Sequence, residues 1–156
     1  MGKHFLMSKR FDKCSAKDFG LEQVEGERCA AIDPKDGTVW AKVSLYDFGW
    51  GKENGYYKKP FLTFPQLYSL VLNNESGDDL YGAAAIILDH FPDELLAECE
   101  GIMNDHARKQ EFRKLIEVFD LKNPANRCPI QGKSACQINS DYSRWKRVSD
   151  KAAKIG

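Results

Sequence analysis

The chain has 156 residues, 42% of them hydrophobic and 29% charged, and its 23 basic and 23 acidic residues give a formal net charge of zero. These fractions are typical of a soluble globular protein, and the length favours a single domain, residues 1–156, that buries about 68–70% of the surface of its unfolded chain. The neutral total weighs against a protein devoted to nucleic acid. Apolar runs stay well short of about 18 residues, so we expect no segment that spans a membrane.

The cysteine pattern argues against a disulfide framework and against a zinc finger, because the cysteines are odd in number and form no C-x-x-C pair. They are Cys14, Cys29, Cys99, Cys128 and Cys136. Reduced thiols are normal in the cytoplasm, where we expect the protein to be. The first residues agree with this location, because the short apolar run at Phe5 is flanked by Lys3 and Lys9 and does not resemble a signal peptide.

The neutral total conceals three segments of different charge. Residues 1–59 carry eleven basic and nine acidic groups, a net charge of +2. Residues 60–107 carry nine acidic groups and no lysine or arginine, a net charge of −9. Residues 108–156 carry twelve basic and five acidic groups, a net charge of +7. Such an asymmetry either serves a partner or is neutralised within the fold.

The first segment predicts a β-hairpin followed by an aromatic loop. Two short apolar runs, Cys29–Ile32 and Thr38–Leu45, flank residues 33–37, which are rich in turn-forming types. Alternate residues of the second run are apolar and are expected to form one buried face: Val39, Ala41, Val43 and Leu45. The stretch Tyr46–Lys59 is rich in glycine and aromatic residues, so we expect a structured loop there.

The second segment, residues 60–107, predicts acidic helices. Thr63 and Gln66 stand three apart, as in a capping box, and indicate the start of a first helix. Residues 73–77 end this first helix, and apolar residues then recur at helical spacing from Leu80 up to Pro92, which ends the second helix and suits the first turn of the next. We interpret residues 79–104 as an antiparallel pair of helices whose acidic side chains face outward.

The stretch LYGAAAIILDHFPDELLAECEGIM, residues 80–103, resembles one unit of a HEAT-type helical repeat. It combines a first helix of small residues, a short turn with proline and acidic residues, and a leucine-rich second helix. The resemblance implies a helical hairpin in this part of the chain.

The third segment, residues 108–156, predicts two basic helices. The first covers residues 107–121, and its apolar positions include Phe112 and Phe119. The second begins at a capping-box pattern near Ser134, and its apolar stripe, which contains Trp145, is expected to dock on the core. The predicted fold class is therefore helix-rich α+β, an N-terminal β-hairpin followed by about five α-helices.

Two patterns that suggest a ligand are better explained by ordinary structure. Gly132–Ser134 resembles the end of a phosphate-binding loop, but Arg127 occupies the place of the first glycine of that motif. His90, Cys99 and His106 are metal-ligating types, but the predicted helix limits separate them. We expect no metal and no cofactor.

The sequence predicts that the protein is not an enzyme, because its three histidines stand in no order typical of a nucleophilic triad. Two alternatives remain open. One is a small hydrolase that uses paired carboxylates. The other is a nucleic-acid-binding protein that uses the basic C-terminal helix, with Arg144, Arg147 and Lys151 on its surface.

The acidic helices are the strongest functional candidate, because nine negative charges without interleaved positive ones would steer a basic partner. We expect a binding surface of aromatic and acidic side chains from the first two segments. These are Trp50, Tyr56, Tyr57, Asp78, Asp79, Tyr81, Asp89, Asp93, Glu94 and Glu98. In size, cytoplasmic character and anionic surface the chain is similar to small bacterial immunity proteins, and this resemblance implies a toxin as the basic partner.

Overall fold

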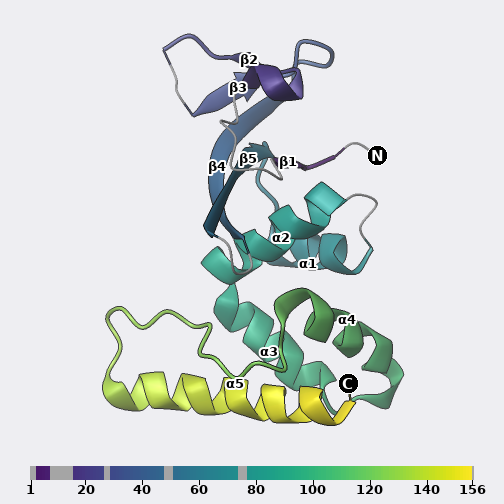
Figure 1. Ribbon diagram of the computed structural model, residues 1–156, viewed down its shortest axis with the longest axis vertical. Coiled ribbons are helices and arrows are strands. Elements are labelled where there is room, and N and C mark those ends of the chain that lie inside the picture. The colour runs from purple at the N-terminus through teal and green to yellow at the C-terminus, as the bar shows by residue number, and fades with distance from the viewer. Residues whose placement is uncertain (1–2, 8–15, 27–28, 48–50, 74–76, 156) are drawn as a thin grey trace. The chain divides into compact units, whose positions relative to one another are not determined.

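The protein is an α+β protein, as the sequence predicts, and its elements are shown in Figure 1. The computed structural model describes residues 3–7, 16–26, 29–47, 51–73 and 77–155. The chain divides into two compact units, residues 1–86 (unit 1) and residues 87–156 (unit 2), where the sequence predicts one domain.

Unit 1 is built on a five-stranded antiparallel sheet. Its strands are β1 (Phe5–Met7), β2 (Glu22–Gln23), β3 (Ala30–Ile32), β4 (Val39–Asp47) and β5 (Gly51–Lys58). Their order across the sheet is β1-β5-β4-β3-β2. Strands β3 and β4 form the predicted hairpin, with Ile32 opposite Val39 and Ala30 opposite Ala41.

The stretch predicted as an aromatic loop, Tyr46–Lys59, is mostly the strand β5. This strand pairs along β4 on one side and with β1 on the other, where Tyr57 lies opposite Phe5. The loop prediction was wrong because glycine and asparagine have low strand propensity. Pairing on both sides holds the strand in place despite that composition.

One face of the sheet carries a hydrophobic cluster in which Trp40 and Tyr56 pack with Leu21. The short helix η1 (Ala16–Phe19) adds Ala16 to this cluster, and the Phe19 ring meets Tyr56 edge-on, with centroids 5.9 Å apart. The apolar cluster therefore closes this face with residues close to β2 in the sequence.

The opposite face is covered by aromatic rings and by the helix α2 (Gly77–His90). Phe5 stacks on Tyr57 with ring centroids 4.4 Å apart, and α2 approaches Phe5 so closely at Gly82 that a Cβ atom there would collide with the ring. Because both faces of the central strands are covered, the predicted single buried face is wrong. Trp40 is 5% exposed, whereas Val39 is 36% exposed.

A buried carboxylate connects α2 to β1. Asp79, which is 5% exposed, accepts hydrogen bonds from the backbone N–H groups of His4 at 2.9 Å and Phe5 at 3.0 Å. The neighbouring Asp78 forms an ion pair with the exposed Lys3 at 3.8 Å. The first turn of α2 thus fixes the edge strand of the sheet.

Helix α1 (Phe64–Leu72) begins where the capping-box pattern predicts. The backbone N–H of Thr63 donates to Oε1 of Gln66 at 2.9 Å, and Leu67 and Val71 are buried.

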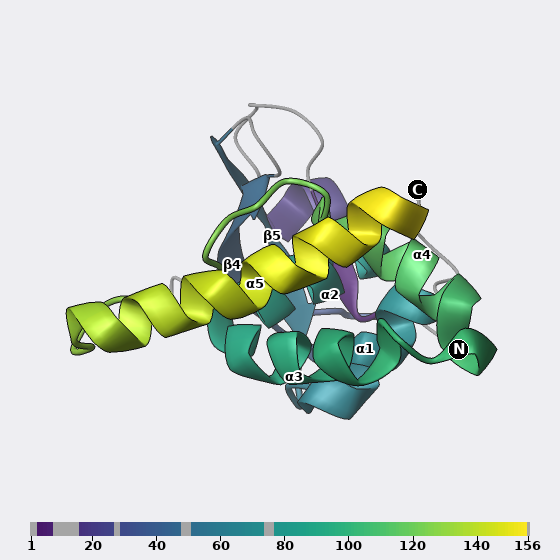
Figure 2. The same ribbon diagram turned by 90° about the horizontal axis from the view of Figure 1, so that it is seen from below.

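Unit 2 contains the last turn of α2, from residue 87, and the helices α3 (Pro92–Ile102), η2 (His106–Arg108), α4 (Lys109–Phe119) and α5 (Ala135–Ile155). Helix α3 packs against α4 and α5, and α4 packs against α5 near its C-terminal end (Figure 2). Pro92 is the first residue of α3, as predicted. Only Phe91 separates α3 from α2, whereas antiparallel helices are joined by loops of about two to five residues. The HEAT-like pairing of residues 79–104 therefore stays a sequence resemblance.

The core of unit 2 is formed by one apolar face from each long helix. Its largest fully buried side chains are Ile87, Leu95, Leu96, Ile102, Phe112, Leu115, Leu121, Trp145 and Val148. The predicted docking of Trp145 on the core is confirmed. The predicted cap of α5 is confirmed as well, because the backbone N–H of Ser134 donates to Gln137 at 3.0 Å and that of Gln137 to Ser134 Oγ at 3.2 Å.

Arg127 organises the loop between α4 and α5. Its guanidinium lies over the Trp145 ring, 4.9 Å from the centroid, and donates to the carbonyl oxygens of Asp120, Asn123 and Ala125. These hydrogen bonds satisfy carbonyl groups at the end of α4 and in the loop, so a single side chain joins the loop to the core.

The Asp79 contact yields the first prediction. Replacing Asp79 with alanine leaves two backbone N–H groups without this acceptor and is expected to reduce the stability of unit 1 by about 2 kcal/mol. The measurement is denaturant unfolding of the full chain, followed through the NMR signals of unit 1. Asp78→Ala is the matched control in the same helical turn and is expected to reduce stability by less than about 1 kcal/mol, because its partner Lys3 is 3.8 Å away and 54% exposed. Equal losses for the two variants would contradict the role of Asp79.

Candidate functional site

The acidic residues predicted as a binding surface fall into two groups, and those of unit 1 are engaged. Asp79 is buried against the backbone of β1, and Asp78 is paired with Lys3. Glu75, which also belongs to the acidic segment, lies outside the described residues. The N-terminal part of α2 therefore uses its carboxylates in the fold.

Two carboxylates of α3 form ion pairs within unit 2. Glu98 accepts from Arg108 at 2.6 Å, and Arg108 also donates to Glu111. Glu100 accepts two hydrogen bonds from Arg144 of α5. The hydrogen bonds to Glu111 and Glu98 raise the pKa of Arg108, and the one to Glu100 raises the pKa of Arg144. Part of the charge of residues 60–107 is thus neutralised by residues 108–156.

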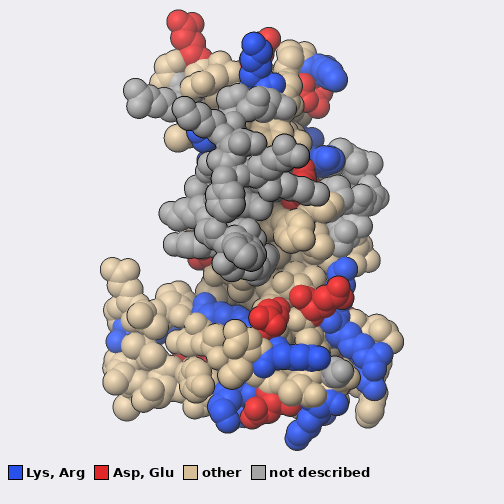
Figure 3. Space-filling view, viewed as in Figure 1, with Lys and Arg blue, Asp and Glu red and all other residues tan. Residues whose placement is uncertain are grey.

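Three acidic residues on either side of the α2–α3 junction remain on the surface, Asp89 in the last turn of α2 and Asp93 and Glu94 in the first turn of α3. Asp89, Asp93 and Glu94, here called the acidic corner, are exposed and form no ion pair with any residue that the structure describes. Asp93 and Glu94 lie in the first turn of α3, where negative charge is favourable next to the positive end of the helix dipole. On the face seen in Figure 3, basic and acidic side chains are interspersed over α3, α4 and α5 and form no continuous acidic patch.

The aromatic residues predicted to line the surface are mostly in the interior. Tyr56 is 4% exposed and Tyr57 is 3% exposed, and both pack within unit 1. Burial raises the pKa of Tyr57, whose hydroxyl oxygen accepts from the backbone N–H of Leu62 at 2.7 Å. Tyr81 is 50% exposed. Trp50 lies outside the described residues.

Two cysteines of unit 2, Cys99 and Cys128, are buried, and Cys128 lies next to Asp93 of the acidic corner. Burial raises the pKa of Cys99 to about 12. Burial also raises the pKa of Cys128 to about 11, and the Asp93 carboxylate acts in the same direction. The Trp145 indole N–H donates to the Cys128 sulfur at 3.2 Å. Neither thiol resembles an activated nucleophile, because activation requires a lowered pKa.

The structure describes the residues of both patterns that were set aside in the sequence. Lys133 of the loop-like tripeptide forms an ion pair with Asp141 at 2.6 Å. Over the described parts of the chain, no three histidine, cysteine or acidic side chains are arranged to hold a metal ion.

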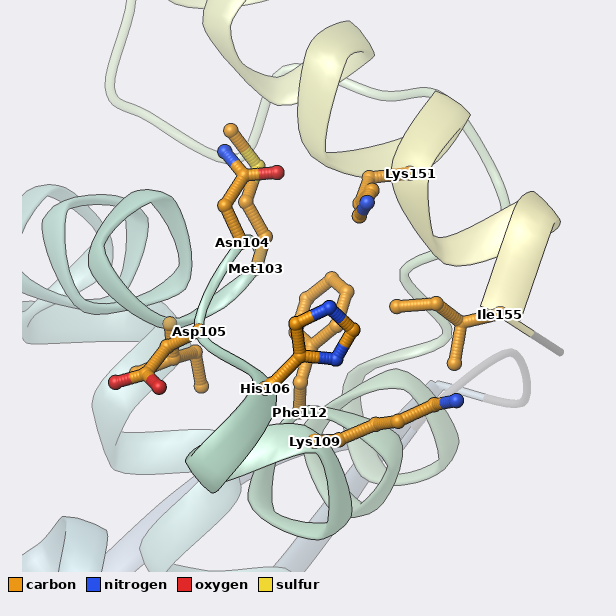
Figure 4. Close-up of a pocket in the computed structure, with 9 residues that line it drawn as sticks. Met103, Asn104, Asp105, His106, Lys109, Phe112, Lys151 and Ile155 are labelled. Carbon is orange, nitrogen blue, oxygen red and sulfur yellow. The ribbon is translucent and has the colours of Figure 1, made fainter.

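A pocket that the sequence did not indicate lies among α3, η2, α4 and α5 (Figure 4). It has a volume of about 120 Å³. Its lining comes from two distant stretches: Ile102, Met103, Asn104, Asp105, His106, Lys109, Phe112, Lys151 and Ile155. The periodicity of each stretch predicts its helix, but no local signal reports that they meet.

Comparison with family models, with curated proteins and with solved structures finds no match to this chain. Among the helices that the structure describes, none has the length and apolar character needed to cross a membrane.

Thiol reactivity provides the second prediction. Cys29 and Cys136 are exposed and are expected to react quickly with iodoacetamide at pH 8, whereas Cys99 and Cys128 are expected to react only after unfolding. A pKa raised to about 11 leaves about one thiolate in a thousand at this pH. Peptide mass spectrometry of labelled protein measures each site separately, with guanidinium-unfolded protein as the control. Labelling of Cys128 as fast as that of Cys136 would indicate an activated thiol and would contradict this description.

Proposed function

We propose that the chain is a non-enzymatic protein-binding domain and that the acidic corner of unit 2 contacts a basic partner. The observation that carries the proposal is the exposure of Asp89, Asp93 and Glu94 without ion pairs in the described part of the chain. The sequence adds to this, because residues 60–107 contain no lysine or arginine that could neutralise them locally.

The acidic corner is expected to raise the association rate with a partner more than the affinity. Three neighbouring negative charges attract a positively charged surface from beyond contact distance and raise the association rate, and salt screens that attraction. Affinity then depends on closer contacts.

A basic protein is the partner class that this charge pattern fits. A basic nuclease toxin that is neutralised by an immunity protein belongs to this class of partner. The proposal therefore includes an immunity role for this chain. The cytoplasmic location expected from the reduced cysteines belongs to the same proposal.

Nucleic-acid binding remains a second candidate because some cations on α4 and α5 are also unpaired. Arg113, Arg147 and Lys154 are exposed and form no ion pair with a described residue. Against it, Arg144 is held by Glu100, and Lys146 lies 3.8 Å from Asp150. Unit 2 as a whole has twelve basic and eleven acidic residues, a net charge of +1, so its field is weak at long range.

The third prediction tests the acidic corner with a defined basic probe, an oligolysine peptide. Titration into isotope-labelled protein at low salt is expected to shift the amide signals around Asp89–Glu94, and added salt is expected to reverse the shifts. The triple variant D89N/D93N/E94Q is expected to weaken binding about tenfold, because the local field is lost. Neutral side chains are used because lysines at the start of α3 would oppose the helix dipole.

The matched control is E22Q/E25Q/E117Q, which removes three exposed carboxylates elsewhere and changes the net charge equally. The control is expected to weaken binding less than about threefold. Equal weakening by both triple variants would show that only total charge matters and would refute the acidic corner. Binding of a short DNA duplex at physiological salt, with shifts along α4 and α5, would favour the second candidate instead.

A further inference from the structure

The pocket shown in Figure 4 combines cationic groups at its opening with an apolar interior. His106, Lys109, Lys151 and Ile155 surround the opening, and the Phe112 ring lies behind the imidazole. Every lining residue belongs to unit 2. The pocket therefore depends only on the packing of α3, η2, α4 and α5.

The positive charges of this pocket are not neutralised within unit 2. Lys109 and Lys151 form no ion pair with any acidic side chain in the described ranges. The acidic residue of the lining is Asp105, and its carboxylate accepts the backbone N–H of Ala107 at 3.0 Å and points away from the opening (Figure 4). Two like charges near a partly enclosed space repel each other, and a bound anion relieves that repulsion.

The interior of the pocket selects for an apolar group. Phe112 and Ile102 are buried beneath the pocket, and the partly exposed side chains of Met103 and Ile155 provide hydrocarbon surface beside the charged opening. Pockets for drug-sized ligands have volumes of about 300–1,000 Å³. At about 120 Å³ this pocket has room only for a small molecule or for the end of a larger one.

We propose that the pocket binds a small organic anion, a carboxylate or phosphate monoester with a compact apolar body. Lys109 and Lys151 contact the charged group, and Met103 and Ile155 contact the apolar body. The side-chain amide of Asn104, which also lines the pocket, supplies a hydrogen-bond donor without adding charge. The proposal is independent of the acidic corner, because the two sites share no residue and attract ligands of opposite charge.

The test uses phenyl phosphate as the probe, at constant ionic strength and with the full chain. NMR titration is expected to shift the amide signals of residues 102–112 and 151–155, with a Kd on the order of millimolar for a ligand of this size. Inorganic phosphate lacks the apolar body and is expected to bind at least about threefold more weakly. Benzyl alcohol lacks the charge and is expected to produce no saturable shift.

The variant K109Q/K151Q is expected to weaken phenyl phosphate binding about tenfold, since it removes both charged contacts. The control K114Q/K154Q removes one lysine from each of the same two helices, α4 and α5. Both lysines lie outside the pocket lining, so the control is expected to change the Kd less than about twofold. The proposal is overturned if the two variants weaken binding equally, or if the probe shifts signals without saturation. Tighter binding of benzyl alcohol than of phenyl phosphate overturns it as well, because the site would then select for the apolar body alone.

Discussion

The ion pairs that α3 makes with its neighbours determine which charges unit 2 presents to solvent. Glu98 is joined to Arg108, and Glu100 is joined to Arg144. The side chains of both pairs are between 28% and 38% exposed, so each pair contributes little stability, up to about 1 kcal/mol. Burial of Trp145 and its neighbours provides most of the packing energy. The main effect of the pairs is electrostatic, because they remove two carboxylates from an otherwise uniformly anionic segment.

The charged residues of the two proposed sites lie near the two ends of α3. Asp93 and Glu94 of the acidic corner lie at the N-terminal end of the helix, and the pocket begins at its C-terminal end, about 16 Å away for eleven residues. Asp93 and Glu94 complement the dipole of α3 at its N-terminal end. For Asp93 and Glu94 the local role and the proposed binding role therefore favour the same negative charge, and both sites depend on α3 staying packed against α4 and α5.

Local signals predicted much of the fold. The capping boxes at Thr63 and Ser134 and the proline at position 92 gave the starts of three helices, because these features act within a single turn. The strand β5 escaped prediction because its sequence resembles a loop and its partners, β1 and β4, decide its conformation. The burial of Tyr56 and Tyr57 was not predicted for the same reason, because it follows from the pairing of β5 with β1 and β4.

The candidate sites were only partly predictable from the sequence. The stretch that contains Asp89, Asp93 and Glu94 was identified by its charge, but the partners of Glu98 and Glu100 could not be, since Arg144 lies 44 residues away from Glu100. The pocket among α3, η2, α4 and α5 was not predicted. It brings His106 next to Lys151 through helix packing, and neither residue belongs to a local motif.

A double-mutant cycle across the Glu100–Arg144 pair tests most directly whether α3 and α5 share their charges. The variants are E100Q, R144M and their combination, and the measurement is the free energy of unfolding of the full chain, followed through the NMR signals of unit 2. The account predicts a favourable coupling of about 0.5–1 kcal/mol that decreases with added salt. Additivity of the two substitutions within about 0.3 kcal/mol would mean that Glu100 is free. The segment would then keep more of its negative charge on the surface than the three residues of the acidic corner.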